Sequence, residues 1–452
     1  MKPSEVHATI KKYMIGDGHP IVVDLEKSHG AYIIDGVTGR EYIDFFTYFA
    51  SIPIGHNHPK MREPEFLEKL TLAAINKPSS SDMYTTFMAE FVETFARVAM
   101  PDEMQHLFLI SGGALAVENA LKTAFDWKVR KNMQKLGNTN GTIPDMLVEG
   151  LGTKIIHFEE AFHGRSGYTL SLTNTADPRK YMYFPKFNWP RIVTPKLHFP
   201  VTDQGIEAVK QVEEIAIAQI ESAVKQYPGD IAALIIEPIQ GEGGDNHFRP
   251  EFFRELRRLA DEHEFLFIVD EIQSGMGITG KMWAIDQYGV QPDVIAFGKK
   301  AQVCGIIAGP RIDEVKGHVF EESSRINSTW GGNLVDMVRA TRYLEIIAEE
   351  NLLEHTTKMG KHLLSGLNAV AEDTNGLVSN VRGSGMMVAF DMPTAVTRDE
   401  MLDTMKQNGL YALKCGQQGI RFRGMLDVPQ DVIDKAVEIV DVSVQKTAVK
   451  VG

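Results

Sequence analysis

Two short apolar runs that end in charged side chains constrain this chain more than any other feature. Residues 265–269 read FLFIV and lead into Asp270, and residues 294–297 read VIAF and lead, through one glycine, into Lys299. Neither run alternates polar and apolar residues, which is typical of strands buried on both faces of a parallel sheet. Ligands of open α/β sheets bind beyond the carboxyl ends of the strands, so we expect this acid and this lysine at one sheet edge, in a site or as a plain ion pair.

Two earlier predicted strands also end in segments suited to a ligand. Residues 106–110 are followed by the small residues SGGA and then by a helix, an arrangement that lets an anion reach free backbone N–H groups. A tight turn explains these small residues equally well. Residues 155–158 lead to Phe162 and Arg165, which could stack on a planar ring and bind a carboxylate. The alternative is a packed phenylalanine and a surface arginine.

A third predicted strand, residues 231–236, is followed by Glu237 and Glu242 among several glycines. Glycine permits unusual backbone angles, so we predict a mobile loop that faces a ligand, with a plain glycine-rich turn as the alternative. Five strand ends in succession thus present an anion nest, an aromatic ring with an arginine, acids with glycines, an aspartate and a lysine. We interpret them as one convergent site.

Composition excludes several classes of partner. The net charge is −13 and the positive charges form no long block, so we expect neither nucleic acid nor anionic membrane as a partner. No apolar run is long enough to span a bilayer, and the polar start MKPSEVHATIKK does not read as a signal peptide. Cys304 and Cys415 are too few for a disulfide framework or a metal site. We therefore predict a cytoplasmic protein without a metal.

The convergent groups match the needs of pyridoxal phosphate. This cofactor requires a lysine to form an imine, an acid that keeps its ring nitrogen protonated, an aromatic ring to stack on and a nest for its phosphate. Asp270 and Ile272 would lie on the same side of an extended strand, so that one could touch the ring nitrogen while the other packs on the ring face. The residues by themselves therefore predict an enzyme that uses pyridoxal phosphate.

Nearly the whole chain resembles the class-III aminotransferases of fold type I. This resemblance implies an α/β fold in which a large domain with a mostly parallel seven-stranded sheet is joined by a smaller α/β domain. The smaller domain would be built from residues 1–75 and 334–452, and the large domain from residues 76–333. The stretches that carry the resemblance are SGGALAVENALKTAFDWK (111–128), AFHGRSGYTLSLTNT (161–175), EPIQGEGGDNHFRPEFF (237–253), VDEIQSGMGITG (269–280), DVIAFGKK (293–300) and NSTWGGNLVDMVRA (327–340).

The resemblance also assigns roles around the cofactor. Lys299 would hold pyridoxal phosphate as an imine, because the lysine of this family stands six residues after an aspartate such as Asp293, and Lys300 is its rival. Asp270 would pair with the ring nitrogen. Thr329 would reach the phosphate of a second subunit, which implies a homodimer with its active sites at the interface. The other implied cofactor contacts are the backbone N–H groups of Gly113 and Ala114, the stacking ring of Phe162, the side chains of His163, Glu237 and Ile272, and Gln273 at the ring 3′-oxygen.

The stretches at 161–175 and 297–305 resemble the branch of the family that acts on lysine. The implied reaction moves the ε-amino group of L-lysine to 2-oxoglutarate and yields 2-aminoadipate 6-semialdehyde and L-glutamate. Arg165 would bind the carboxylate remote from the reacting amine, Arg421 would bind the α-carboxylate of glutamate, and Glu242 would cover Arg421 when lysine is bound, with Gln273 also near the substrate. The alternatives are an ornithine or 4-aminobutyrate aminotransferase, or a binding protein of the same fold without turnover.

Overall fold

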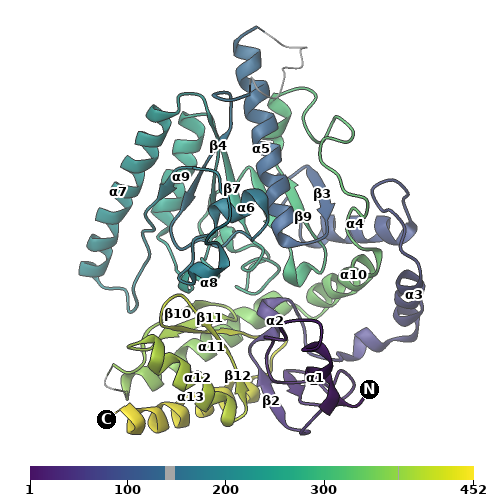
Figure 1. Ribbon diagram of the computed structural model, residues 1–452, viewed down its shortest axis with the longest axis vertical. Helices are drawn as coiled ribbons and strands as arrows, with labels where there is room; N and C mark the ends of the chain where they lie inside the picture. The colour runs from purple at the N-terminus through teal and green to yellow at the C-terminus, as the bar shows by residue number, and fades with distance from the viewer. Residues whose placement is uncertain (138–147, 375, 452) are drawn as a thin grey trace.

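The chain folds into a large lobe and a small lobe, which lie one above the other in Figure 1. The computed structural model describes residues 1–137, 148–374 and 376–451. The large lobe is built on a seven-stranded sheet, and the small lobe holds two short sheets together with both ends of the chain. None of the described helices is long and apolar enough to cross a membrane.

The large sheet has the strand order β3-β9-β8-β7-β6-β4-β5. From β8 to β5 neighbouring strands run parallel, and β9 is the one described strand of this sheet that runs opposite to the others. This arrangement confirms the predicted α/β fold with a mostly parallel seven-stranded sheet. The strands are β3 (His106–Ile110), β4 (Lys154–Phe158), β5 (Arg191–Ile192), β6 (Ile231–Ile236), β7 (Leu266–Asp270), β8 (Val294–Phe297) and β9 (Cys304–Ala308).

The central strands do not alternate polar and apolar residues, because both of their faces are buried. In β6, Leu234 and Ile236 belong to the apolar cluster on one face, and Ala233 and Ile235 belong to the cluster on the other. Helix α9 packs into the first cluster and α5 into the second, so each face of the sheet has its own cover. The large-lobe helices are α3 (Pro64–Ile75), α4 (Thr86–Val98), α5 (Gly113–Lys135), α6 (Gly167–Leu172), α7 (Asp203–Gln226), α8 (Gly241–Gly244), α9 (Pro250–Glu262) and α10 (Leu334–Glu349).

The small lobe joins the two ends of the chain. Ile43 of β2 lies opposite Leu410 of β12 in a parallel pair, so the N-terminal and C-terminal segments share one sheet. The second sheet has the order β10-β11-β14-β13. The elements are α1 (Val6–Ile10), β1 (Tyr32–Ile34), β2 (Glu41–Asp44), the left-handed turn α2 (Thr47–Ala50), α11 (Leu352–Glu372), β10 (Ser379–Ser384), β11 (Met387–Asp391), α12 (Ala395–Gln407), β12 (Leu410–Tyr411), β13 (Leu413–Cys415), β14 (Gly419–Arg423) and α13 (Gln430–Val451).

Helices close to both predicted domain boundaries pack on the core of the large lobe. Phe66 and Ala73 of α3 belong to this core, and so does Leu344 of α10. Two residues further along α10, Ile346 belongs to the core of the small lobe. Helix α10 therefore contributes to both cores, and the division of the chain at residues 75 and 333 stays a prediction.

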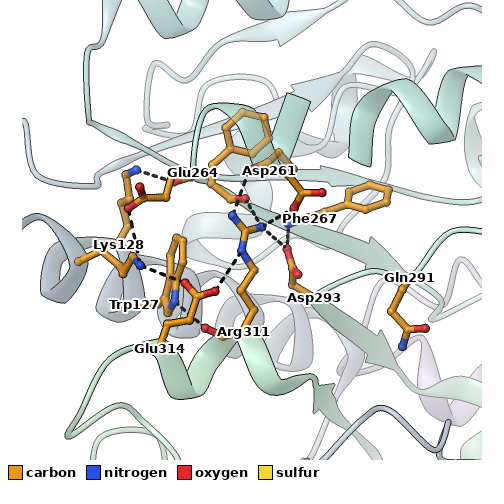
Figure 2. Close-up of polar contacts among 12 residues, drawn as sticks. Trp127, Lys128, Asp261, Glu264, Phe267, Gln291, Asp293, Arg311 and Glu314 are labelled. Carbon is orange, nitrogen blue, oxygen red and sulfur yellow. Dashed lines mark hydrogen bonds and ion pairs between the residues drawn. The ribbon is translucent and has the colours of Figure 1, made fainter. Parts of the chain in front are cut away.

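The sheet edge at which β7 and β8 begin is held by charged groups (Figure 2). Asp293 accepts a hydrogen bond from the backbone N–H of Phe267 at 2.6 Å, and its Oδ2 lies 3.1 Å from Nη1 of Arg311. The ammonium of Lys128 donates to the backbone carbonyl of Glu264, and burial lowers the pKa of Lys128 to about 8. These charges tie strands, helix α5 and the segment after β9 together. The opposite edge, where the parallel strands end, is the edge at which the sequence places the site.

Candidate active site

The candidate active site lies where β6, β7 and β8 end and α5 begins, on the side of the large lobe that faces the small lobe (Figure 1). Glu237 directly follows β6, Asp270 is the last residue of β7, and Lys299 comes two residues after β8. Because β6, β7 and β8 are parallel neighbours, these three side chains start from one edge of the sheet. Arg421 comes to the same place from β14 of the small lobe, since it contacts Gln273 just beyond β7.

Asp270 is a buried acid with a fixed orientation. Its Oδ2 lies 2.7 Å from Nδ1 of His163, and its Oδ1 accepts a hydrogen bond from the backbone N–H of Ile272 at 3.0 Å. Burial by itself would lower the pKa of His163, but the hydrogen bond and the charge of Asp270 outweigh burial and raise that pKa. This contact and the N–H of Ile272 fix the orientation of the Asp270 carboxylate, whose oxygens can accept a hydrogen bond from a protonated ring nitrogen.

Glu237 acts on the backbone around the site. Its Oε1 accepts a hydrogen bond from the N–H of Phe162 at 2.9 Å, and its Oε2 accepts one from the N–H of Gly241 at 3.1 Å. Burial raises the pKa of Glu237 to about 7. Glu237 thus joins the segment that carries the predicted stacking ring to the segment that carries Glu242.

Lys299 and Lys300 have different environments. Burial, together with the charges of Arg421 and Arg423, lowers the pKa of Lys299 to about 8. Within the described parts of the chain, no group accepts a hydrogen bond from its amine. Lys300 instead donates to the backbone carbonyl of Gln273 at 2.7 Å and to that of Ala50 at 3.3 Å. Lys300 therefore holds the two lobes together, and Lys299 is left as the amine that can react.

Gly113 and Ala114 are the first two residues of α5 and follow Gly112, whose φ of 104° favours glycine. The helix has 23 residues, so its free N–H groups and its dipole favour an anion at this end. A Cβ on Gly113 would lie 3.1 Å from Cγ2 of Ile272, so the start of α5 lies close to the segment after β7. Ile272 reaches this place from a turn, because β7 ends at Asp270, and the expected alternation along one extended strand does not continue to it.

A charged network links the small lobe to the site. The buried Arg423 pairs with Asp245, with 2.7 Å between Nη1 and Oδ2. Nη2 of Arg421 lies 2.7 Å from Oε2 of Glu242. Oε1 of Gln273 accepts hydrogen bonds from Arg423 at 2.8 Å and from Arg421 at 3.3 Å. Since this oxygen is engaged by the arginines, the amide nitrogen of Gln273 is the group that can donate to a ring oxygen.

Glu242 lies in the one-turn helix α8 and not in the open loop that the sequence suggested. Burial would raise the pKa of Glu242, but the charges of Arg421 and Lys180 outweigh burial and lower that pKa. Lys180 pairs with the second carboxylate oxygen of Glu242, and its amine also lies 5.9 Å from the centre of the Phe162 ring. The guanidinium of Arg165 lies 6.0 Å from the same ring, and this arginine is exposed.

Sequence reasoning missed Lys180, Asp245 and Arg423. The spacing of Arg421 and Arg423 puts both side chains on one face of a strand, which is a signal that could have revealed Arg423. No local pattern marks the other two. Strand β14 stays paired with β11 as far as Arg423, so Arg421 lies within a regular strand.

Thr329 lies on an exposed loop at the side of the site. Its backbone carbonyl accepts hydrogen bonds from the hydroxyl groups of Ser79 and Ser81. Next to it, Trp330 is 40% exposed and lies under the amine of Lys77, 4.1 Å from its ring centre. This loop is thus fixed to the segment before α4 and presents its polar and aromatic side chains outward.

The residues present fit pyridoxal phosphate. Asp270 offers an oriented carboxylate to a protonated ring nitrogen, Lys299 offers an amine of lowered pKa to a carbonyl carbon, and the start of the long helix α5 can hold a phosphate. Nε2 of His163 is buried and has no hydrogen-bond partner within the described residues. Gly298 brings the lysine segment close to the start of α5, because a Cβ on Gly298 would lie 3.0 Å from Cδ1 of Ile272.

Comparison with known proteins agrees with this geometry. The family model described as aminotransferase class-III matches residues 13–444. Proteins named L-lysine-epsilon aminotransferase are 49% identical in Mycobacterium tuberculosis, over 97% of this chain and 95% of the relative, and 47% identical in Streptomyces clavuligerus, over 98% and 95%. The structure of a lysine aminotransferase from M. tuberculosis superposes with a TM-score of 0.94 at 48% identity, covering 99% of this chain and all of that one. The chain therefore belongs to the class-III aminotransferases, a family of pyridoxal phosphate enzymes.

Proposed function

We propose that this chain transfers the ε-amino group of L-lysine to 2-oxoglutarate and forms 2-aminoadipate 6-semialdehyde and L-glutamate in two half-reactions. The observation that carries the proposal is an identity of 47–49%, over 96–98% of the chain, to proteins named L-lysine-epsilon aminotransferase. Relatives named 4-aminobutyrate aminotransferase are only 31–32% identical. The lysine reaction is therefore favoured over that of the other amines.

The pair of Arg421 and Glu242 supports this choice because the two half-reactions place different groups near it. Glutamate and 2-oxoglutarate present a carboxylate beside the reacting carbon, whereas the ε-end of lysine presents only methylene groups there. A buried arginine without a partner is costly, and Glu242 supplies that partner when lysine is bound. When a dicarboxylate is bound, its carboxylate takes the place of Glu242 on Arg421.

Bound pyridoxal phosphate supplies a carbonyl carbon that takes up the amino group and a ring that withdraws electrons from the substrate carbon. Around it, Asp270 would hold the proton on the ring nitrogen, and His163 would orient Asp270. The pKa of Lys299 is lowered to about 8, so a fraction of its amine is neutral at ordinary pH. The neutral amine can take a proton from the substrate carbon and return it. Phe162 stacks on the ring, and Arg165 binds the distant carboxylate of the substrate.

The geometry of the site also supports the remaining proposed cofactor contacts. The N–H groups of Gly113 and Ala114 at the start of α5 would hold the phosphate, Ile272 would pack on the ring, and the amide nitrogen of Gln273 would donate to the 3′-oxygen. We propose in addition that Thr329 binds the phosphate of a second subunit. Its hydroxyl lies on the exposed loop and has no hydrogen-bond partner within the described residues, so it is able to act outside its own chain.

The proposed homodimer is also supported by exposed apolar side chains around this loop. Met83 is 69% exposed and Tyr84 80%, and both lie just after the serines that hold the Thr329 carbonyl. Trp330 adds a further exposed ring. Aromatic and methionine side chains of this kind are enriched in the cores of protein interfaces. Cytoplasmic location stays a prediction.

The test is a single-turnover screen of amines on the cofactor-loaded protein. L-lysine, L-ornithine and 4-aminobutyrate are mixed separately with the protein, and the change in cofactor absorbance is followed in time. We expect L-lysine to react at least tenfold faster than the other two, and the product formed with lysine to be the 6-semialdehyde. Preferential reaction of ornithine or 4-aminobutyrate would assign the chain to another branch, and no reaction with any amine would indicate a binding protein.

A further inference from the structure

The carboxylate of Glu242 lies between two cations that come from different parts of the chain. Its Oε2 is 2.7 Å from Nη2 of Arg421, and its Oε1 pairs with Nζ of Lys180. The side chain of Arg421 is 3% exposed, whereas those of Glu242 and Lys180 are 22% and 19% exposed. One partner of Glu242 is therefore deep in the protein and the other lies nearer to solvent.

Lys180 is held on its own segment, independently of Glu242. It is the last residue of the short 3₁₀ helix η4 (Pro178–Lys180), which precedes β5, and its backbone N–H donates to the carbonyl of Asp177. The carboxylate of Asp177 caps this helix through the N–H of Arg179 at 3.2 Å. The ammonium of Lys180 thus comes to Glu242 from a backbone that has its own hydrogen bonds, and it pairs with the carboxylate oxygen that Arg421 does not contact.

Within the described residues, Arg421 and Lys180 are the cations that pair with Glu242. Arg423, the other arginine nearby, is committed to Asp245 at 2.7 Å. Arg382, on β10, is committed to Asp391 at 2.8 Å. When Arg421 binds the carboxylate of a substrate, Lys180 is accordingly the cation that remains for Glu242.

We propose that Lys180 is a positioning residue that holds Glu242 whenever Arg421 binds a dicarboxylate substrate. The proposal rests on the exchange of partners at Arg421 described above. Without Lys180, the displaced Glu242 would be a partly buried carboxylate beside the carboxylate of the substrate, and both desolvation and like charge oppose that state. With Lys180, Glu242 gives up one cation and keeps the other. Lys180 therefore favours the glutamate and 2-oxoglutarate half-reaction and matters little for lysine.

The test compares Lys180→Met with the wild type in separate half-reactions. Because the Lys180–Glu242 pair is about one-fifth exposed, we expect the variant to lose roughly tenfold in kcat/KM for glutamate and 2-oxoglutarate, mainly through a raised KM. The rate constant with lysine should change by less than about threefold, which is the scatter of an ordinary surface substitution. Lys180→Arg keeps the charge and should restore most of the loss.

Arg179→Met is the matched control, because it removes a positive charge from the residue next to Lys180. The side chain of Arg179 is 76% exposed and, among the described residues, pairs only with Asp177. It should leave both half-reactions near the wild-type values. A second measurement uses glutarate, a dicarboxylate that cannot react, and isothermal titration calorimetry. Lys180→Met should weaken glutarate binding by the same factor as it raises the KM for glutamate.

A double-mutant cycle with Glu242→Gln separates the alternatives. If Lys180 acts through Glu242, adding Lys180→Met to Glu242→Gln changes nothing further. A loss of full size in the Glu242→Gln background would mean that Lys180 binds the substrate carboxylate directly and would overturn the proposal, as would equal slowing of both half-reactions. Failure of the wild type to react with lysine would refute the proposed function alone, because the glutamate and glutarate measurements test Lys180 by themselves.

Discussion

Replacing Glu242 by alanine should separate the two half-reactions of this enzyme. The side chain of Arg421 is only 3% exposed, and Glu242 is the carboxylate that pairs with it, at 2.7 Å. In the proposed lysine complex, methylene groups of the substrate would lie beside Arg421, so the variant would leave a buried guanidinium with no anion. In the glutamate complex, the substrate supplies the anion and Glu242 is not needed.

The magnitude follows from the surroundings of the pair. Breaking a buried ion pair by removing one partner costs about 3–5 kcal/mol. Two features of this site reduce that figure: Glu242 is 22% exposed, and Oε1 of Gln273 still accepts a hydrogen bond from Arg421 at 3.3 Å. We therefore expect a cost of about 2–3 kcal/mol, which corresponds to a roughly 30- to 150-fold slower lysine half-reaction at 1.36 kcal/mol per factor of ten.

Rapid mixing of the cofactor-loaded variant with lysine or with glutamate, followed by absorbance, measures the two half-reactions separately. The glutamate half-reaction should be unchanged or faster, because the substrate no longer competes with Glu242 for Arg421. Glu242→Gln, which keeps the shape and loses the charge, should give the same pattern if charge is responsible. Equal slowing of both half-reactions by Glu242→Ala would refute the reasoning and reduce Glu242 to a structural member of α8.

Three further predictions concern the cofactor and the assembly. Lys299→Ala should abolish turnover and the absorbance of the lysine-linked cofactor. Lys300→Met should keep that absorbance. In a denaturant titration it should lose about 1–3 kcal/mol of stability, because two backbone carbonyls lose their hydrogen-bond donor. The rate at which the cofactor-free protein takes up pyridoxal phosphate should rise about tenfold per pH unit below pH 8 and level off above pH 8. The reason is that the neutral amine of Lys299 reacts and that its pKa is lowered to about 8. A rate that continues to rise towards pH 10 would contradict this prediction. Thr329→Ala should release the cofactor about tenfold more readily in dialysis, and light scattering should give the mass of a dimer; a fully active monomer would contradict the shared site.

The sequence by itself determined the large sheet and the order of its strand ends. Runs such as residues 265–269 are apolar without alternation, and a chain can bury such a run only where both faces of a strand are covered, which is the situation in β7. Parallel strands then bring their carboxyl ends to one edge. Asp270 and Lys299 could for this reason be placed at a common edge from local patterns, and the observed pairing of β7 with β8 agrees.

Only the tertiary structure distinguished Lys299 from Lys300 on physical grounds. The two are adjacent and chemically identical, and the difference arises from Ala50 and Gln273, whose backbone carbonyls lie 250 and 27 residues away along the chain. Local patterns record which residues are buried, because burial repeats with the period of the strand or helix. They do not record which distant partner a buried charge meets.

The partners of Glu242 show the same limit. Arg421 is 179 residues from Glu242 along the chain, and Lys180 is 62 residues from it. Lys180 lies on a 3₁₀ helix of three residues, which is too short to show a periodic pattern of apolar residues. The resemblance to the family implied Arg421 as one partner of Glu242, and no local pattern indicated Lys180. The tertiary structure decided that Glu242 has two partners, because the packing of the small lobe brings Arg421 of β14 to the carboxyl edge of the sheet and the 3₁₀ helix before β5 brings Lys180 there.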